Sequence, residues 1–254
     1  MVIEIMPYKV VSCGCTDPGR TRSNNEDVWV EEPELQIFAV ADGMGGHRAG
    51  EVAAREAINT LFSYIKEHAS KEHLDKISLH EAQKLVERAI AHANSEIFRL
   101  GKSEEQYRGM GTTLCCVYFH PQGVISAHVG DSRIYRLHKK RLEQITHDHS
   151  LLRELLDLGQ INEQQAPDFQ YRNIITRAIG TGTSVEPSFQ IIKPVQGDLY
   201  LMCTDGLTDL VTLEEMESII TQSPNIREAV KTLVKTANDR GGFDNITVVL
   251  MQIL

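Results

Sequence analysis

The pattern of hydrophobic and polar positions predicts both helices and strands. Two stretches, 49–68 and 80–100, repeat apolar residues at helical spacing. Shorter helices are expected at 213–221 and 226–237, with Pro224 marking the junction between them. Strand-like apolar runs are expected at 8–13, 35–41, 112–119, 124–129, 133–137, 189–192, 199–204 and 246–253.

The order of these elements favours an α+β fold over a doubly wound sheet. Strands and helices do not alternate along the chain, and the runs 112–119 and 124–129 are joined by the short turn Pro121-Gln122-Gly123. A turn of this length is typical of antiparallel strands. A helix-like piece at 151–158, followed by a polar and irregular stretch, indicates an inserted surface lobe.

Length and composition fit one large domain. The chain has 254 residues, 41% hydrophobic and 24% charged, with no repeat or linker-like tract, so residues 1–254 are interpreted as a single domain. A net charge of −9 disfavours nucleic acid as a partner, because there is no positive field to attract its backbone. The absence of a signal pattern or an apolar run of about 18 residues predicts a soluble, cytoplasmic protein.

The cysteine pattern disfavours two kinds of site. The spacing contains no CxxC pair near histidines, which argues against zinc, and no cysteine is followed by an arginine after five residues, which argues against thiol-based phosphate chemistry. Small buried hydrophobes are the favoured interpretation of all five: Cys13, Cys15, Cys115, Cys116 and Cys203.

Aspartates stand at one end of four strand-like runs. They are Asp42, Asp131, Asp205 and Asp244. Strand ends in a sandwich converge at one rim, and clustered carboxylates repel one another unless cations or protons neutralise them. Any one of these aspartates alone is more often a turn residue. Four together weaken that alternative and predict a metal site.

The donor types favour hard cations. Oxygen ligands suit Mg²⁺ or Mn²⁺, and no histidine or cysteine stands at ligand spacing. The stretch TDPGRTRSNNEDVW adds Glu26 and Asp27 beside Arg22. A guanidinium in this setting either binds phosphate in a bidentate manner or forms a surface ion pair with the carboxylates.

Seven ordered motifs carry a resemblance that spans nearly the whole chain. They are TDPGRTRSNNED, VADGMGGH, GMGTTL, HVGDSRIYRL, TRAIG, CTDGLTD and GGFDNITVV. In this order they resemble the protein phosphatase 2C family of metal-dependent serine/threonine phosphatases, in its bacterial form. The resemblance implies a four-layer α-β-β-α sandwich, with two antiparallel sheets flanked by helix pairs and a metal site at one edge.

The resemblance also implies which residues hold two Mn²⁺ or Mg²⁺ ions. Asp42 would bridge both ions, and Asp205 and Asp244 would complete the first. Glu26 and the Gly43 carbonyl would support the second, largely through water.

Three further residues are assigned on the same resemblance. Asp131 would share a third, weaker cation with Asp205. Asp27 would orient the shell around the ligands. Asn245 would steady its loop rather than bind metal.

The implied reaction needs no covalent intermediate. A hydroxide between two cations would attack phosphorus in line with the departing seryl or threonyl oxygen. Arg22 would clamp the phosphoryl oxygens, and His47 is the candidate acid for the leaving oxygen. A local hydrogen-bond donor in the loop is an equal alternative for His47.

Residues 147–180, called the flap below, correspond to the family's flap region. The usual His-Pro before Arg-Asn is replaced, since Phe169, Gln170 and Tyr171 precede Arg172-Asn173. Substrate contacts that depend on this segment are therefore open. His147 and His149 are expected to be surface loop residues and are not assigned to the site.

Rival functions and the expected partners complete the interpretation. A pseudophosphatase would be expected to lose a bridging ligand, whereas Glu26, Asp42, Asp205 and Asp244 are all present. A phosphodiesterase or nuclease is a second rival, but such sites more often use histidine ligands. Gly101-Lys102-Ser103 is only a weak echo of a phosphate-binding loop. Within the family, a phosphatase acting on a regulatory partner-switching protein is the alternative. The expected partners are phosphorylated proteins, including a bacterial serine/threonine kinase that the enzyme opposes, with no membrane partner, and a monomer is expected.

Overall fold

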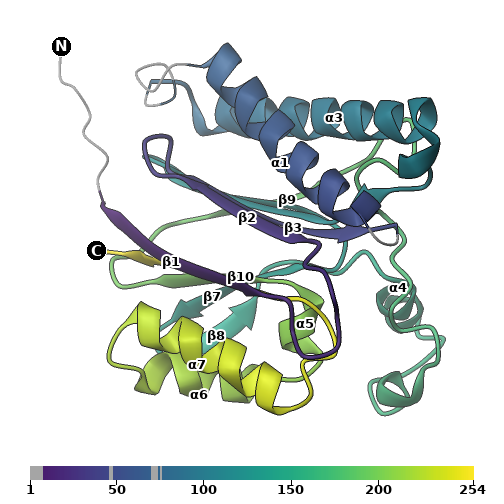
Figure 1. The fold of residues 1–254 in the computed structure, drawn as a ribbon. Helices are drawn as coiled ribbons and strands as arrows, with labels where there is room; N and C mark the ends of the chain where they lie inside the picture. Colours follow the sequence, from purple (N-terminus) through teal and green to yellow (C-terminus); the bar gives the residue numbers. More distant parts are fainter. Residues whose placement is uncertain (1–7, 46–47, 70–73, 75) are drawn as a thin grey trace.

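The computed structural model describes residues 8–45, 48–69, 74 and 76–254, and it shows two antiparallel sheets packed face to face between helices (Figure 1). The first sheet has the order β1-β11-β10-β7-β8. Both chain ends of the described part contribute to it, since β1 pairs with β11 along its whole length. Its strands are β1 (Val10–Asp17), β7 (Arg133–His138), β8 (Arg141–Gln144), β10 (Leu199–Cys203) and β11 (Ile246–Ile253).

The second sheet has the order β2-β3-β5-β6-β9, with a short strand β4 attached to the end of β3. All of its pairings are antiparallel. Its strands are β2 (Asp27–Glu32), β3 (Ile37–Met44), β4 (Gly111–Thr112), β5 (Leu114–His120), β6 (Gly123–Val129) and β9 (Ser188–Ile192).

Helix pairs cover the outer face of each sheet (Figure 1). The second sheet packs against α1 (Arg48–His68) and α3 (Leu79–Ser103), and the first against α6 (Leu213–Gln222) and α7 (Ile226–Asp239). A third apolar core fills the space between the sheets. The four-layer α-β-β-α architecture predicted from the sequence is therefore confirmed.

Local sequence signals explain where these helices begin. Ser78 and Glu81 form a capping box at α3, and Thr212 and Glu215 form another at α6. Each box satisfies backbone N–H groups that the first turn of a helix leaves without partners. The apolar stripe of α3 faces the second sheet, as the helical spacing predicts.

The flap leaves the body of the protein between β8 and β9. It contains α4 (Leu151–Asp157) and the 3-10 turn η2 (Ala166–Asp168), which project to one side (Figure 1). A second short 3-10 turn, η1 (Glu105–Tyr107), follows α3. No helix in the described ranges is both long enough and apolar enough to cross a membrane.

Some sequence predictions are corrected by the structure. The run 112–119 is two strands, because Thr113 leaves the ladder to bind the Asp42 backbone. The five cysteines are free thiols, and three are buried as predicted, but Cys13 and Cys15 on edge strand β1 are only half-buried. The strands β2 and β8 and the single-turn helix α5 (Asp205–Thr208) were not predicted.

Candidate metal centre

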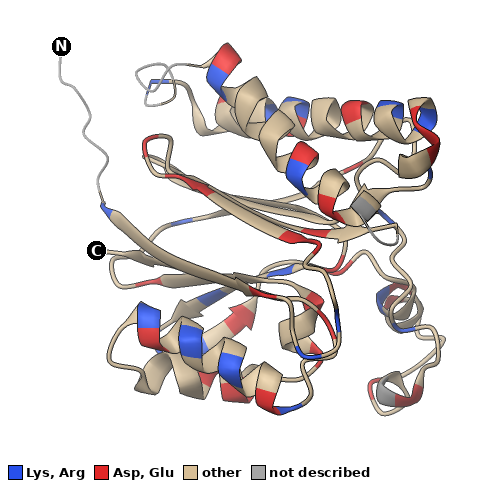
Figure 2. Cartoon of the chain, in the orientation of Figure 1, with Lys and Arg blue, Asp and Glu red and all other residues tan. Residues whose placement is uncertain are grey.

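An open pocket of about 560 Å³ lies at the edge of the sandwich, where strands of both sheets end. Residues far apart in the sequence meet there, and the flap adds Asn173 and Ile175. Figure 2 shows acidic segments, in red, near the start of β2 and around α5. The predicted residues that line the pocket are Arg22, Glu26, Asp42, Gly43, Asp205, Asp244 and Asn245.

The strand order explains why these carboxylates converge. Asp42 stands near the end of β3, directly opposite Asp27 at the start of β2. Asp205 is the first residue of α5, two positions after β10 ends, and Asp244 lies two positions before β11 begins. Because β10 and β11 are antiparallel neighbours, the end of one and the start of the other meet at the same edge.

The backbone of Asp42 is fixed by two threonines of the neighbouring chain segment. Its N–H donates to Thr113 Oγ1 at 2.9 Å, and its carbonyl accepts from the Thr112 hydroxyl at 2.8 Å and the Thr113 N–H at 2.9 Å. The carboxyl group remains directed at its acidic neighbours. Burial, followed by repulsion from Asp27 and Asp205, raises the pKa of Asp42 well above its usual range.

Asp205 shows the same electrostatic signature. Burial, followed by repulsion from Asp131 and Asp209, raises the pKa of its carboxyl well above the ordinary value. Its Oδ1 is buried and has no hydrogen-bond partner within the described ranges. A buried carboxylate oxygen without a donor costs free energy, so this atom is suited to a cation or a proton.

Asp27 joins the two sheets beneath the pocket. Its Oδ2 accepts from the hydroxyls of Thr204 at 2.9 Å and Thr247 at 2.7 Å. Asp27 belongs to the second sheet, whereas Thr204 directly follows β10 and Thr247 lies in β11, both of the first sheet. Burial raises the pKa of Asp27 to about 7, and the two hydroxyl donors oppose that rise. Neither threonine was singled out from the sequence.

Two glycines make room for Glu26. A Cβ on Gly50 would collide with Glu26 Oε2, and a Cβ on Gly43 would collide with the Gly50 carbonyl. The Glu26 backbone is held by Gly43, whose N–H donates to the Glu26 carbonyl at 3.2 Å. Only glycine permits this approach of backbone to carboxylate. The sequence pattern placed Gly50 simply in a helix and missed this contact.

Asn245 braces the loops around the pocket. Its Oδ1 accepts from the Glu26 N–H at 2.8 Å, and its Nδ2 donates to the carbonyls of Pro18 at 3.0 Å and Asn24 at 2.9 Å. All polar atoms of the amide are thereby engaged with backbone groups. The geometry agrees with a residue that steadies the loop.

Arg22 stands at the rim of the pocket. Its side chain is 56% exposed, and Nη2 donates to Asp244 Oδ2 at 2.8 Å. The surface ion pair considered from the sequence is present. The exposed remainder of the guanidinium is still available to a phosphoryl group, because the fork carries five N–H donors.

Asp131 lies beside the pocket, at the turn after β6, rather than among its lining residues. Its negative charge raises the pKa values of Asp42 and Asp205, and its own pKa rises to about 6 because of burial and then repulsion from Asp148. The preceding Gly130 has φ of +103°, a conformation that favours glycine.

The three predicted histidines have different outcomes. His47 lies outside the described residues. His147 is an exposed residue that pairs with Asp157, as expected for the surface of the flap. The expectation of a surface position is wrong for His149, which is 6% exposed because its ring packs on His128 under the start of the flap.

The chemistry of the pocket suits hard cations, whose coordination would include several waters. Within the part of the chain that the structure describes, no three His, Cys, Asp or Glu side chains converge tightly enough to hold an ion alone. Mg²⁺ and Mn²⁺ sites commonly use a few carboxylates and several waters. The raised pKa values and the partnerless Asp205 oxygen are the features that such ions would relieve.

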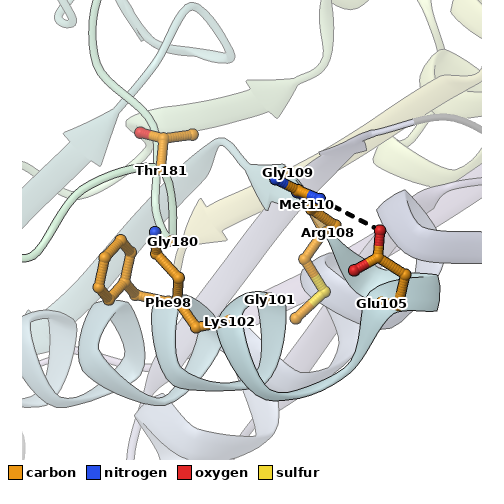
Figure 3. A pocket seen from close by; sticks show the side chains of 9 residues that line it. All are labelled: Phe98, Gly101, Lys102, Glu105, Arg108, Gly109, Met110, Gly180 and Thr181. Atoms are coloured by element: carbon orange, nitrogen blue, oxygen red, sulfur yellow. Dashed lines mark hydrogen bonds and ion pairs between the residues drawn. The ribbon is translucent and has the colours of Figure 1, made fainter.

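A second hollow at the end of α3 lacks this chemistry. Phe98, Lys102 and Thr181 are among the side chains around it (Figure 3). Glu105 supplies the carboxylate on its lining and pairs with Arg108 at 3.2 Å. The acidic pocket at the sheet edge is therefore the candidate metal centre.

Comparisons with known proteins agree with this geometry. The family profile described as protein phosphatase 2C matches residues 20–241. The "Serine/threonine phosphatase stp" of Listeria monocytogenes is 39% identical over 240 residues, covering 93% of each chain. The serine/threonine phosphatase of S. agalactiae has a similar structure, with a TM-score of 0.88, 34% identity and coverage of 96% of this chain and 99% of that one.

A further solved structure bears on the metal. It is the catalytic domain of the serine threonine protein phosphatase PstP in complex with two manganese ions. The TM-score is 0.83 and the identity 34%, with coverage of 97% of this chain and 99% of that chain.

Proposed function

The chain belongs to the protein phosphatase 2C family and is a metal-dependent serine/threonine protein phosphatase, and from this premise we propose that the acidic pocket is its active site. Its substrates are phosphoproteins, and its cofactor is a divalent cation such as Mn²⁺ or Mg²⁺. The observation that carries the proposal is the meeting of four sequence-remote carboxylates in one pocket, two of them with strongly raised pKa values.

The proposed ligands divide into two core positions and a third. Asp42 would hold both core cations, Asp205 and Asp244 would serve the first, and Glu26 with the Gly43 carbonyl would serve the second. The contact with Gly50 supports the assignment of Glu26, because the missing side chain leaves space for that carboxylate beside the pocket that Glu26 lines.

Outside the core, Asp131 and Asp205 would hold a third, weaker cation. The negative charge of Asp131, which raises the pKa of Asp205, supports this pairing. Asp27 and Asn245 hold the surrounding loops through the hydrogen bonds described above.

The chemistry follows from the placement of these groups. When bound, divalent cations would activate the attacking water and offset the charge that develops on the phosphoryl oxygens. Arg22 orients the phosphoryl group from the pocket rim, which lowers the entropic cost of reaching the reactive geometry. His47 donates the proton to the leaving seryl or threonyl oxygen.

The biological setting is also part of the proposal. The relatives are bacterial serine/threonine phosphatases, which supports opposition to a bacterial serine/threonine kinase. We propose that the chain acts as a monomer and as one domain over residues 1–254, with the flap at 147–180 beside the site.

Hydrolysis assays test this active site directly. The wild type should hydrolyse p-nitrophenyl phosphate and a phosphothreonine peptide with Mn²⁺, and a chelator should abolish both activities. Asp42→Asn should remove turnover, whereas Asp239→Asn, which changes an exposed carboxylate on α7, should not. Turnover of Asp42→Asn at the wild-type rate would refute the site.

The rival functions give different results in the same assay. A pseudophosphatase would show no metal-dependent hydrolysis of either substrate. A phosphodiesterase would prefer bis-p-nitrophenyl phosphate to the monoester. The family membership favours the monoester, and so does the absence of a histidine-rich ligand set among the described residues of the pocket lining.

A further inference from the structure

His149 is a buried histidine for which the proposed reaction has no use. It stands at the start of the flap, two residues before α4, and is 6% exposed. Loop histidines are usually solvated, so burial at this point requires a set of specific partners.

The imidazole ring is bonded on both sides. Nδ1 accepts from the Gly130 N–H at 3.2 Å, so the neutral ring carries its proton on Nε2, which faces the Ser188 hydroxyl at 2.9 Å. The ring stacks on His128 with 4.5 Å between centroids and an interplanar angle of 19°. His128 Nε2 in turn lies 2.8 Å from the His147 carbonyl.

The backbone of His149 is bonded as well. Its N–H donates to the Gly130 carbonyl at 3.0 Å, and its carbonyl accepts from the Thr176 N–H at 2.8 Å. The two chain segments of the flap therefore meet at this residue. A bridge between Ser150 and Ile175 continues the pairing beside it.

These contacts join two parts of the active site. Ile175, next to the bonded Thr176, lines the metal pocket together with Asn173. Gly130, which His149 holds by both its N–H and its carbonyl, directly precedes Asp131. A displacement of His149 would therefore move the flap and the Asp131 turn together.

We infer that His149 is a positioning residue that fastens both ends of the flap to the turn carrying Asp131. This inference rests on the proposed active site, because it assigns the flap residues and Asp131 to one catalytic pocket. Histidine suits the task because its neutral ring presents an acceptor on one side and a donor on the other. Burial favours this neutral form by lowering the pKa of His149 to about 3.

We call the contacts by which His149 fastens the flap to the Asp131 turn the clamp. Three variants separate its two ring contacts, Nδ1 with Gly130 and Nε2 with Ser188. His149→Ala removes both ring contacts. His149→Asn keeps an acceptor near the Nδ1 position for Gly130, and Ser188→Ala removes only the partner of Nε2. His147→Ala is the matched control, because its exposed ring pairs with Asp157 within the flap.

The first measurement is amide hydrogen exchange over 150–176 in the chelated protein, which does not depend on catalysis. His149→Ala should speed exchange there and around Gly130 by about tenfold, whereas His149→Asn and Ser188→Ala should lie between it and the wild type. His147→Ala should match the wild type.

The second measurement is steady-state hydrolysis of a phosphothreonine peptide with Mn²⁺. His149→Ala should raise KM about tenfold with a smaller loss in kcat, because the flap positions substrate. Wild-type exchange and KM in His149→Ala would overturn the inference. If His149→Ala does not fold, His149→Asn and Ser188→Ala decide: intermediate exchange and KM support the clamp, and wild-type values refute it.

Failure of the clamp and failure of the active site give different results. If the proposed site is wrong, the wild type shows no Mn²⁺-dependent hydrolysis, or Asp42→Asn leaves that hydrolysis unchanged. If only the clamp is wrong, the wild type hydrolyses the peptide, and the His149 and Ser188 variants do so with unchanged KM and unchanged flap exchange.

Discussion

The two ends of strand β10 carry two aspartates in opposite electrostatic settings. Asp198, directly before the strand, is 2% exposed and accepts from Arg136 Nε at 2.9 Å and from the Val195 N–H at 3.2 Å, with His138 Nδ1 at 2.7 Å. Asp205, just beyond the other end, has a buried Oδ1 without a donor and acidic neighbours. The protein neutralises the Asp198 carboxylate with its own side chains, whereas in the proposed site an external cation would neutralise Asp205.

This difference means that Asp198 should affect the stability of the fold, whereas Asp205 should affect catalysis. A buried charge held by its own arginine contributes to the folded state, and loss of one partner leaves the other uncompensated. Carboxylates that repel one another lower stability until a cation binds. Substitutions at the two ends of β10 should therefore affect different measurements.

The largest expected effect is on turnover at the acidic end. Asp205→Ala and Asp42→Ala should each lower kcat/KM by about a thousandfold or more, because each removes a proposed cation ligand. The free energy of unfolding of the chelated protein should stay within about 1 kcal/mol of wild type, since a repulsive charge is removed. Steady-state assays and urea unfolding measure the two quantities.

If these variants lost stability as well as activity, the proposed difference between the two ends of β10 would be contradicted. Asp205→Asn controls for packing, because it keeps the shape of the side chain and removes the charge. It should lose turnover to a similar degree and remain folded.

The next effect is on stability at the paired end. Asp198→Ala should lower the free energy of unfolding by about 3 kcal/mol, because it leaves the Arg136 guanidinium without its buried partner. Turnover per folded molecule should change little. The double variant Arg136→Met/Asp198→Leu should recover part of the loss, and an additive loss in the double variant would argue against the pairing.

The third effect links the cation to folding. Mn²⁺ at a hundred times its dissociation constant should raise the free energy of unfolding by about 2.7 kcal/mol, because only the folded chain brings the ligands together. Thermal unfolding with and without a chelator measures the shift. Asp205→Ala should lose most of it and Asp198→Ala should keep it; a shift that persists in Asp205→Ala would place the cation elsewhere.

Sequence patterns predicted the elements whose local signals are strong. The strand at 246–253 was predicted with its observed bounds because it is a nearly continuous apolar run, with seven of its eight residues buried. β8 was missed because only Leu142 of its four residues is buried, and α5 is a single turn, too short to show a helical period. Burial and length thus decide what the pattern can show.

The same limit applies to the site. Aspartates at strand ends are visible in the sequence, and the structure brings Asp42, Asp205 and Asp244 to one pocket. The threonines that hold Asp27 and the glycine that makes room for Glu26 are contacts between distant segments. Such contacts leave no local pattern, so only the folded chain reveals them.

A smaller effect is expected for Arg22, the arginine at the rim of the pocket. Arg22→Ala should raise KM for a phosphopeptide about tenfold, equivalent to about 1.4 kcal/mol, with a smaller fall in kcat. The reason is that the exposed guanidinium orients phosphate, whereas the ligands of the cation stay in place. Arg22→Lys should recover only part of the loss, since it lacks the planar fork. An unchanged KM in Arg22→Ala would restrict this residue to its ion pair with Asp244.

The smallest effect is on the free energy of unfolding at acidic pH. It compares the acidic pocket with the neutral ring of His149. Burial lowers the pKa of His149 to about 3, and the charges of His128, Arg177 and His147 act in the same direction. The unfolded chain takes up a proton on this ring near pH 6.5, whereas the folded chain does so only near pH 3. The ring therefore costs stability progressively as the pH falls through that window, and it costs almost nothing at pH 7.

His149→Asn cannot titrate, so the stability difference between the wild type and this variant should shift in the variant's favour by about 1 kcal/mol between pH 7 and pH 5.5. The raised pKa values of Asp42 and Asp205 act in the opposite sense, but they are common to both proteins and cancel in the difference. Urea unfolding of the chelated proteins at both pH values measures the shift. A difference that is constant with pH would mean that the ring is already charged, or exposed, in the folded protein.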